Sequence, residues 1–198
     1  SMDIKILSSL TETDVGCSAL VIGTHNGIFH SDEVVACATL CLLNSDKSVQ
    51  ILRSRDSEML KKCDICVDVG GGKFDHHQPD FNKARASTVL YASAGLVWNH
   101  YGKDLIKQLL AKYFPENNSD IVVNTVFKAF DESYIALVDC EDNGIATAPH
   151  IFSFIASFLP LWFENSTAKF NHQFAKALEV TTEVLEQALK TTIGKEIS

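Results

Sequence analysis

Two adjacent histidines in the segment FDHHQ, residues 74–78, are the residues of this sequence most suited to chemistry. The segment follows a run of glycines and places Asp75, His76 and His77 in one turn. Imidazole and carboxylate groups together suit divalent ions such as Mn²⁺, Mg²⁺, Zn²⁺ and Fe²⁺. An isolated DHH triplet is equally compatible with a charged turn, so a metal site requires further ligands from other segments.

Such ligands occur near the ends of other predicted elements: His25, His30, Asp32, Asp68, Asp139 and Asp142. This set exceeds the needs of one ion and therefore favours two. Two ions about 3.5–4 Å apart would hold a hydroxide nucleophile and a phosphoryl oxygen. Asp139 and Asp142 are three residues apart and share one helix face, and we prefer Asp139 as the ligand. Asp142 and Asp75 are alternatives that would cap the helix or orient a ligand histidine.

The segments that must position these residues alternate between apolar runs and helical patterns. Strands are predicted over residues 17–24, 49–55 and 64–69, and helices over 31–44 and 57–63. This alternation predicts a right-handed parallel α/β sheet, whose carboxyl-terminal edge is the usual place for a site. Arg53 and Arg55 follow the second strand at this edge and are candidates to contact a substrate phosphate.

The rest of the chain is predicted to be helical, over residues 87–101, 103–113, 119–140, 151–163 and 166–192. The fold class is therefore α/β, a parallel-sheet part at about 15–80 followed by a helical part at about 87–198. At 198 residues we expect a single domain. The glycines at 70–72 permit a tight turn, and a phosphate cradle is the alternative reading.

Composition excludes several classes of function. The net charge of −8 argues against a basic surface that grips nucleic-acid backbone, although bound cations can supply positive charge locally. The apolar segments are shorter than the roughly 20 residues of a membrane span, and the first residues lack the pattern of a secretory signal. We therefore expect an intracellular protein without a membrane partner, in the nucleus, mitochondrion or cytoplasm. The sequence favours no particular oligomeric state.

The segments GTHNGIFHSDE, ILRSRD, DICVDVGG, FDHHQ and VDCEDNG occur in this order. In this combination, with STVLYASAGLVWNHYG and LPLWF, the chain resembles the family of the melanocyte proliferating gene one protein. That family is placed in the DHH phosphoesterase superfamily, with RecJ-type exonucleases, manganese-dependent pyrophosphatases and cyclic-dinucleotide phosphodiesterases. The resemblance extends from about residue 20 to residue 190.

The resemblance implies a divalent-metal phosphodiesterase, a 3′–5′ exonuclease acting on single-stranded RNA in nuclei and mitochondria. Asp68 would be the bridging carboxylate, and His77 would face the substrate phosphate. The implied metal ligands are His25, His30, Asp32, Asp68, His76 and Asp139. His30 stands where the superfamily more often has aspartate, so the preferred metal is open between Mn²⁺ or Mg²⁺ and Zn²⁺ or Fe²⁺. Family chains are longer and place substrate between two domains, so we expect the substrate domain to be absent here.

Two other functions stay open. The chain could hydrolyse small phosphate compounds such as pyrophosphate, short oligonucleotides or cyclic dinucleotides, because its acidic surface repels long polyanions. Alternatively it could be a metal-stabilised scaffold without catalytic activity that binds partners through its helical half.

Overall fold

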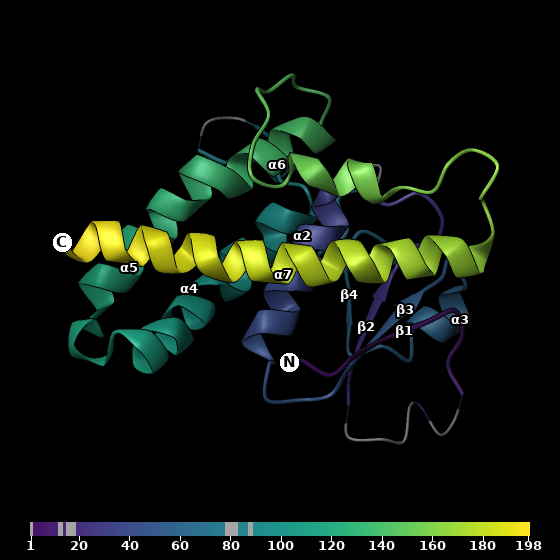
Figure 1. Cartoon of the computed structure of the whole chain (residues 1–198), viewed down its shortest axis with the longest axis horizontal. Coiled ribbons are helices and arrows are strands. Elements are labelled where there is room, and N and C mark those ends of the chain that lie inside the picture. Colours follow the sequence, from purple (N-terminus) through teal and green to yellow (C-terminus); the bar gives the residue numbers. More distant parts are fainter. Residues whose placement is uncertain (1, 12–13, 15–18, 78–82, 87–88) are drawn as a thin grey trace.

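A four-stranded parallel sheet forms one end of the protein (Figure 1). The computed structural model describes residues 2–11, 14, 19–77, 83–86 and 89–198. The strands lie in the order β1-β3-β2-β4, and every neighbouring pair is parallel. They are β1 Ile4–Leu7, β2 Leu20–Thr24, β3 Val49–Arg53 and β4 Ile65–Cys66. The parallel α/β sheet predicted from the sequence is therefore confirmed.

Strand β1 is an element that the sequence analysis did not predict. It pairs with β3 in the register Ile4↔Val49, and its four residues are too few to show a clear alternation of apolar and polar side chains. The other three strands occur where they were expected but are shorter. Residues 17–18 of the first predicted strand lie outside the described residues.

Helix α2, Ser31–Leu43, lies at the centre of the molecule, and residues 32–42 are all buried. A helix that is apolar on every face needs cover on every side. Helices α4, Ser93–Tyr113, and α7, Thr167–Ile197, pack against it, and it shares one core with Ile22 and Ile51 of the sheet. This packing also carries the acidic residues of its first turn into the interior.

The remaining elements are α3 Ser57–Leu60, the 3-10 helix η1 Pro115–Asn117, α5 Asp120–Phe130, the π-helical turn η2 Asp131–Ile135, α6 Ala136–Asp142 and the 3-10 helix η3 Ser153–Phe158. Two predictions for the helical half were wrong. Helix α4 continues through Gly102 instead of breaking there. A Cβ at this position would lie 2.7 Å from Trp98 of the same helix and 3.0 Å from Phe127 of α5, so the glycine lets α4 and α5 pack closely. The segment 151–163 forms only η3, and Pro160 follows its end.

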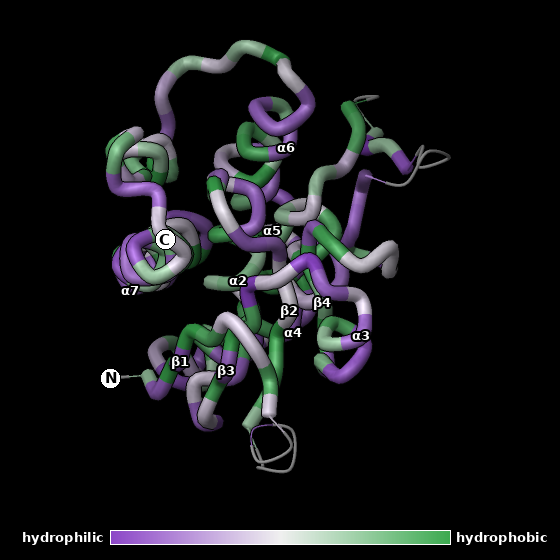
Figure 2. Tube along the Cα trace, turned by 90° about the vertical axis from the view of Figure 1, so that its right-hand side faces the viewer, coloured by the Kyte–Doolittle hydropathy of each residue, from purple (hydrophilic) through white to green (hydrophobic). Residues whose placement is uncertain are grey.

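Helix α7 connects the two parts of the molecule. It runs along the whole length of the protein, past α2 and α5 (Figure 1), and lies to one side of α2 when the molecule is turned (Figure 2). Its buried residues include Phe174, Leu178, Leu185 and Leu189, spaced so that they form one stripe. None of the helices in the described ranges is both long and apolar enough to cross a membrane.

The first turn of α4 makes a close contact with α6. The N–H of Gly95 donates to Oδ1 of Asp139 at 3.0 Å. A Cβ at Gly95 would lie only 1.9 Å from Oδ2 of the same aspartate. Glycine is therefore required for these two helices to approach each other.

We predict that Gly95→Ala lowers the free energy of unfolding by at least about 1–3 kcal/mol, the usual cost of overpacking a well-packed interior. Gly194→Ala is the matched control, because nothing lies within 4 Å of a Cβ at Gly194 in α7. It should stabilise the protein by up to about 1 kcal/mol through helix propensity. Urea unfolding measures the free energy of unfolding of both variants. An equal change in the two would show that the contact between Gly95 and Asp139 does not require glycine.

Candidate metal centre

Imidazole and carboxylate groups from separate segments meet at the carboxyl-terminal edge of the sheet. Among the described residues, three groups have candidate ligand atoms that all lie within 4.8 Å of one another: His25 with His30 and Glu33; Asp68 with His76 and His77; and Asp32 with His76 and Asp142. Of the predicted ligands, this brings together His25, His30, Asp32, Asp68 and His76. It also adds Glu33, His77 and Asp142.

His25 directly follows β2 and points into the protein, where it is 6% exposed. Its Nε2 lies 3.0 Å from Asp68 Oδ2 and 3.2 Å from Glu33 Oε1. Glu33 is the site residue that the sequence analysis missed. Its place beside Asp32 was a signal, but an acid in the first turn of a helix is more simply explained by the helix dipole.

Glu33 is fully buried, and its two oxygens have different surroundings. Oε1 accepts a hydrogen bond of 2.7 Å from the N–H of His30, the residue that caps α2. Oε2 has no hydrogen-bond partner within the described part of the chain, and His30 Nδ1 lies 3.9 Å from it. A buried anionic oxygen without a donor is costly, so Oε2 fits a bound cation.

Asp32 is held by the first turn of α4. Its carboxylate accepts hydrogen bonds from the N–H groups of Ala94, at 2.7 Å, and Ser93, at 3.2 Å. The first N–H groups of a helix have no acceptor within the helix, and its positive dipole end favours an anion. This arrangement fixes Asp32 with Oδ2 3.5 Å from His76 Nε2.

The carboxylate of Asp68 lies close to the imidazoles of His25, His76 and His77. Its Oδ1 lies 3.2 Å from His76 Nε2 and 3.3 Å from His77 Nδ1, while Oδ2 faces His25. The backbone at Asp68 is left-handed, with φ +60°. Such a conformation is uncommon outside glycine and often occurs at functional sites. The N–H of Asp68 donates to the carbonyl of Phe74 at 3.0 Å, which folds the glycine turn back toward the site.

Asp75 orients His77 instead of facing the other ligands. Its Oδ1 accepts a hydrogen bond from the N–H of His77 at 3.1 Å and lies 3.0 Å from Nδ1 of the same ring. Its Oδ2 accepts one from the N–H of Gly71 at 2.9 Å. The histidine side chain is 58% exposed, so it stands at the rim of the centre.

Of the two aspartates of α6, Asp142 and not the preferred Asp139 lies beside His76. Asp142 Oδ2 lies 2.9 Å from His76 Nε2, at the end of α6. Asp139 is buried one turn earlier, where Arg85 donates to it through Nε at 2.8 Å. Arg85 also pairs with Asp131. Although the two aspartates share one helix face, Arg85 and the N–H of Gly95 occupy the carboxylate of Asp139, which leaves Asp142 to face His76.

The two arginines predicted to contact substrate differ in position. Arg53 is 1% exposed and donates to the carbonyl of Gly27 at 2.6 Å and to Asn171 Oδ1 at 2.9 Å. Its guanidinium also lies 4.6 Å from the ring centre of Phe174. Arg53 is thus a structural link to α7 and unavailable to a substrate, which corrects that prediction. Arg55 stays exposed at the sheet edge and donates to the carbonyl of Asn26 at 2.8 Å.

The charges of the centre are strongly coupled. Burial lowers the pKa of His25, but Asp68 and Glu33 outweigh this effect and raise that pKa to about 10. Burial also lowers the pKa of His76, but the neighbouring Asp142, Asp32 and Asp68 outweigh this effect and raise that pKa to about 12. Burial, together with the charges of Asp68 and Asp142, raises the pKa of Asp32. The carboxylates therefore require compensating positive charge, which either protons or metal ions can supply.

A small cavity of about 160 Å³ adjoins the centre. His30, Asp32 and Asp142 line it on one side, and apolar residues including Phe29 and Leu159 on the other. The donor set of carboxylates and imidazoles suits a divalent ion, and the orphaned oxygen of Glu33 supports the same conclusion. The identity and number of ions remain predictions.

We predict that Mn²⁺ or Zn²⁺ raises the melting temperature of the wild-type chain. A ligand at 100 times its Kd stabilises by about 2.7 kcal/mol, which corresponds to about 5–10 °C for a chain of this size. His76→Ala should strongly reduce the shift, because His76 belongs to two of the ligand groups. His172→Ala, an exposed histidine of α7, is the control and should keep the shift. A full shift in the His76 variant would contradict the assignment.

The two aspartates of α6 should have separable effects. Asp139→Asn leaves Arg85 without its buried partner and should cost about 3–5 kcal/mol of stability, while the metal-dependent shift in melting temperature persists. Asp142→Asn should change the stability of the metal-free protein much less but reduce that shift. Urea unfolding with and without Mn²⁺ measures both. Loss of the shift in the Asp139 variant alone would reverse the assignment.

The comparisons with known proteins agree on one family. The model of the family MYG1_exonuc, described as "Uncharacterised protein family (UPF0160)", matches residues 21–197. The MYG1 exonuclease of Mus musculus is 42% identical over 138 residues, which cover 63% of this chain and 35% of that protein. The MYG1 exonuclease of Homo sapiens is 41% identical over 138 residues, covering 63% and 36%.

The MYG1 protein C27H6.8 of Caenorhabditis elegans is 36% identical over 191 residues, covering 90% of this chain and 54% of that protein. No solved structure matches significantly. The chain thus spans about a third to a half of the length of these curated relatives. The family model covers nearly the whole chain, and the chain therefore belongs to the MYG1 family.

Proposed function

We propose that this chain is the metal-binding domain of a divalent-metal-dependent phosphodiesterase, a 3′–5′ exonuclease that acts on single-stranded RNA. The observation that carries the proposal is the convergence on His76 Nε2 of carboxylate oxygens from Asp142, Asp68 and Asp32, at 2.9, 3.2 and 3.5 Å. The relatives from mouse and human that are named exonucleases support nuclease activity. From the family resemblance of the sequence motifs, we also assign the protein to the nucleus, mitochondrion or cytoplasm.

The ligand assignment follows from the geometry of the centre. We assign two divalent ions, Mn²⁺ or Mg²⁺ with Zn²⁺ or Fe²⁺ as alternatives, and Asp68 as the carboxylate shared between them. The proposed ligands are His25, His30, Asp32, Glu33, Asp68, His76 and Asp142. Bound ions would supply Lewis-acid chemistry, an activated water and neutralisation of phosphoryl charge. The protein fixes these ligands in advance through the first turn of α4 and the left-handed backbone at Asp68.

His77 and Arg55 are the groups we assign to the substrate phosphate. His77 is more than half exposed, and Asp75 holds its Nδ1; with both ring nitrogens protonated, Nε2 would donate to a phosphate oxygen. Arg55 is exposed next to Asn26, one residue beyond His25. A guanidinium at this edge offers paired donors to a phosphate. Because the chain carries a net charge of −8, these few groups and the bound ions would supply the attraction for a polyanion.

End-labelled single-stranded RNA tests the activity. With Mn²⁺, we expect the full-length protein to shorten 5′-labelled RNA stepwise from its 3′ end. The double variant Asp68→Ala, His76→Ala should lower the rate by more than about a hundredfold. Substituting residues that only hydrogen-bond to metal ligands already lowers activity or metal affinity by about 10–100-fold. His172→Ala is the control and should retain the wild-type rate. Full activity in the double variant would refute the proposal.

Hydrolysis of small phosphate compounds is the second candidate, because the net charge of −8 disfavours a long polyanion. Turnover of dinucleotides and of twenty-mers by the same preparation distinguishes the two. A strong preference for the dinucleotide would contradict RNA exonuclease activity and favour hydrolysis of small phosphate compounds. A protein that binds metal but cleaves neither would instead be the scaffold.

A further inference from the structure

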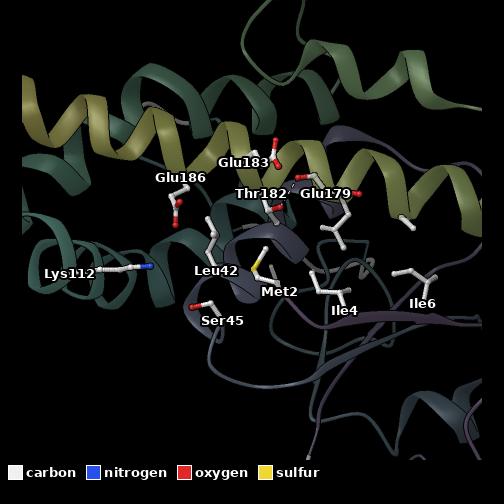
Figure 3. Close-up of a pocket in the computed structure, with 12 residues that line it drawn as sticks. Met2, Ile4, Ile6, Leu42, Ser45, Lys112, Glu179, Thr182, Glu183 and Glu186 are labelled. Carbon is white, nitrogen blue, oxygen red and sulfur yellow. Dashed lines mark hydrogen bonds between the residues drawn. The ribbon is translucent and has the colours of Figure 1, made fainter.

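A groove away from the metal centre runs between strand β1 and helix α7 (Figure 3). It has a volume of about 560 Å³, within the range of ligand pockets. The end of α2 and the end of α4 close it through Leu42, Ser45 and Lys112. None of its lining residues belongs to the candidate metal centre, so the proposed exonuclease function makes no use of it.

The floor of the groove is apolar. Figure 3 shows Ile4 and Ile6 of β1 extending toward α7, with Met2 and Leu42 beside them. These β1 residues are only partly buried, so they can still gain burial from a ligand. β1 is an edge strand and pairs among the described strands only with β3. Its outer side therefore presents backbone groups to an added segment.

The rim along α7 is acidic. Glu179, Glu183 and Glu186 are spaced by four and three residues and so share one face of the helix. Within the described chain no ion pair is found for any of them at 4.0 Å or less. Lys112, at the end of the groove, is the one basic residue among the lining residues. An apolar floor is thus bordered by three carboxylates with a single lysine among the lining residues.

We propose that this groove binds a short segment of a partner protein that carries apolar side chains next to lysine or arginine. The apolar side chains would cover Met2, Ile4 and Ile6, and the cations would pair with the glutamates of α7. Charge complementarity decides against other occupants. A nucleic acid would be repelled by the rim, and a second copy of this chain would bring the same acidic face and a net charge of −8.

A fluorescein-labelled heptapeptide of alternating lysine and leucine is the probe, titrated with the whole chain and followed by fluorescence anisotropy. Replacing Glu179, Glu183 and Glu186 together by glutamine should weaken binding by about tenfold or more, because three ion pairs are lost. The matched control replaces Glu116, Glu132 and Glu196, which are exposed outside the groove. Both triple variants remove three negative charges, so only the position differs. The control should bind within about twofold of the wild type.

A second peptide tests the floor without altering the protein. Alternating lysine and serine keeps the charge but cannot cover the apolar side chains, and it should bind at least about tenfold more weakly. Equal weakening by the two triple variants would show a general charge effect and overturn the proposal. Equal affinity of the two peptides, or no binding of either, would overturn it too. Self-association in sedimentation that depends on the three groove glutamates would identify a second copy as the occupant instead.

Discussion

The burial of carboxylates beside histidines constrains every other part of this molecule. Asp32, Glu33 and Asp68 are 1%, 0% and 5% exposed, and removing an anion from water costs several kcal/mol unless it is paired. The N–H groups of α4 compensate part of this cost at Asp32. His25 and His76 compensate more, but only in their protonated form. The protein is therefore built to hold extra positive charge at this edge, which is why a divalent metal fits it.

The helical half is as necessary to the centre as the sheet. Helix α4 supplies the N–H groups that hold Asp32, and α6 supplies Asp142. Arg85 joins α6 to the π-helical turn before it by binding Asp139 and Asp131. The glycine at position 95 lets these helices come close enough for Asp142 to reach His76. Substitutions far from the ligands can therefore displace a ligand.

The acidic residues of this chain serve two different purposes. Those of the metal centre are buried and face histidines, whereas those of the groove rim on α7 lie toward the surface and form no ion pair within 4.0 Å among the described residues. The first arrangement suits a small, highly charged ion that replaces protons. The second suits a larger partner whose charges stay partly hydrated, so that each pair contributes little and apolar contact must add to it. The net negative charge is thus compatible with nuclease chemistry when the two regions are considered separately.

Local sequence patterns determined the parallel sheet, the central helix and the association of DHH with His25, His30, Asp32 and Asp68. These predictions were within reach because apolar periodicity sets strands and helices, and because parallel strands end at a common edge. Tertiary structure alone decided that Arg53 is buried against α7, that Glu33 lies beside His25 and that Asp142 instead of Asp139 lies beside His76. It also decided that IKIL forms an edge strand. The spacing along a helix fixes which residues share a face, but only packing against other elements decides what that face meets.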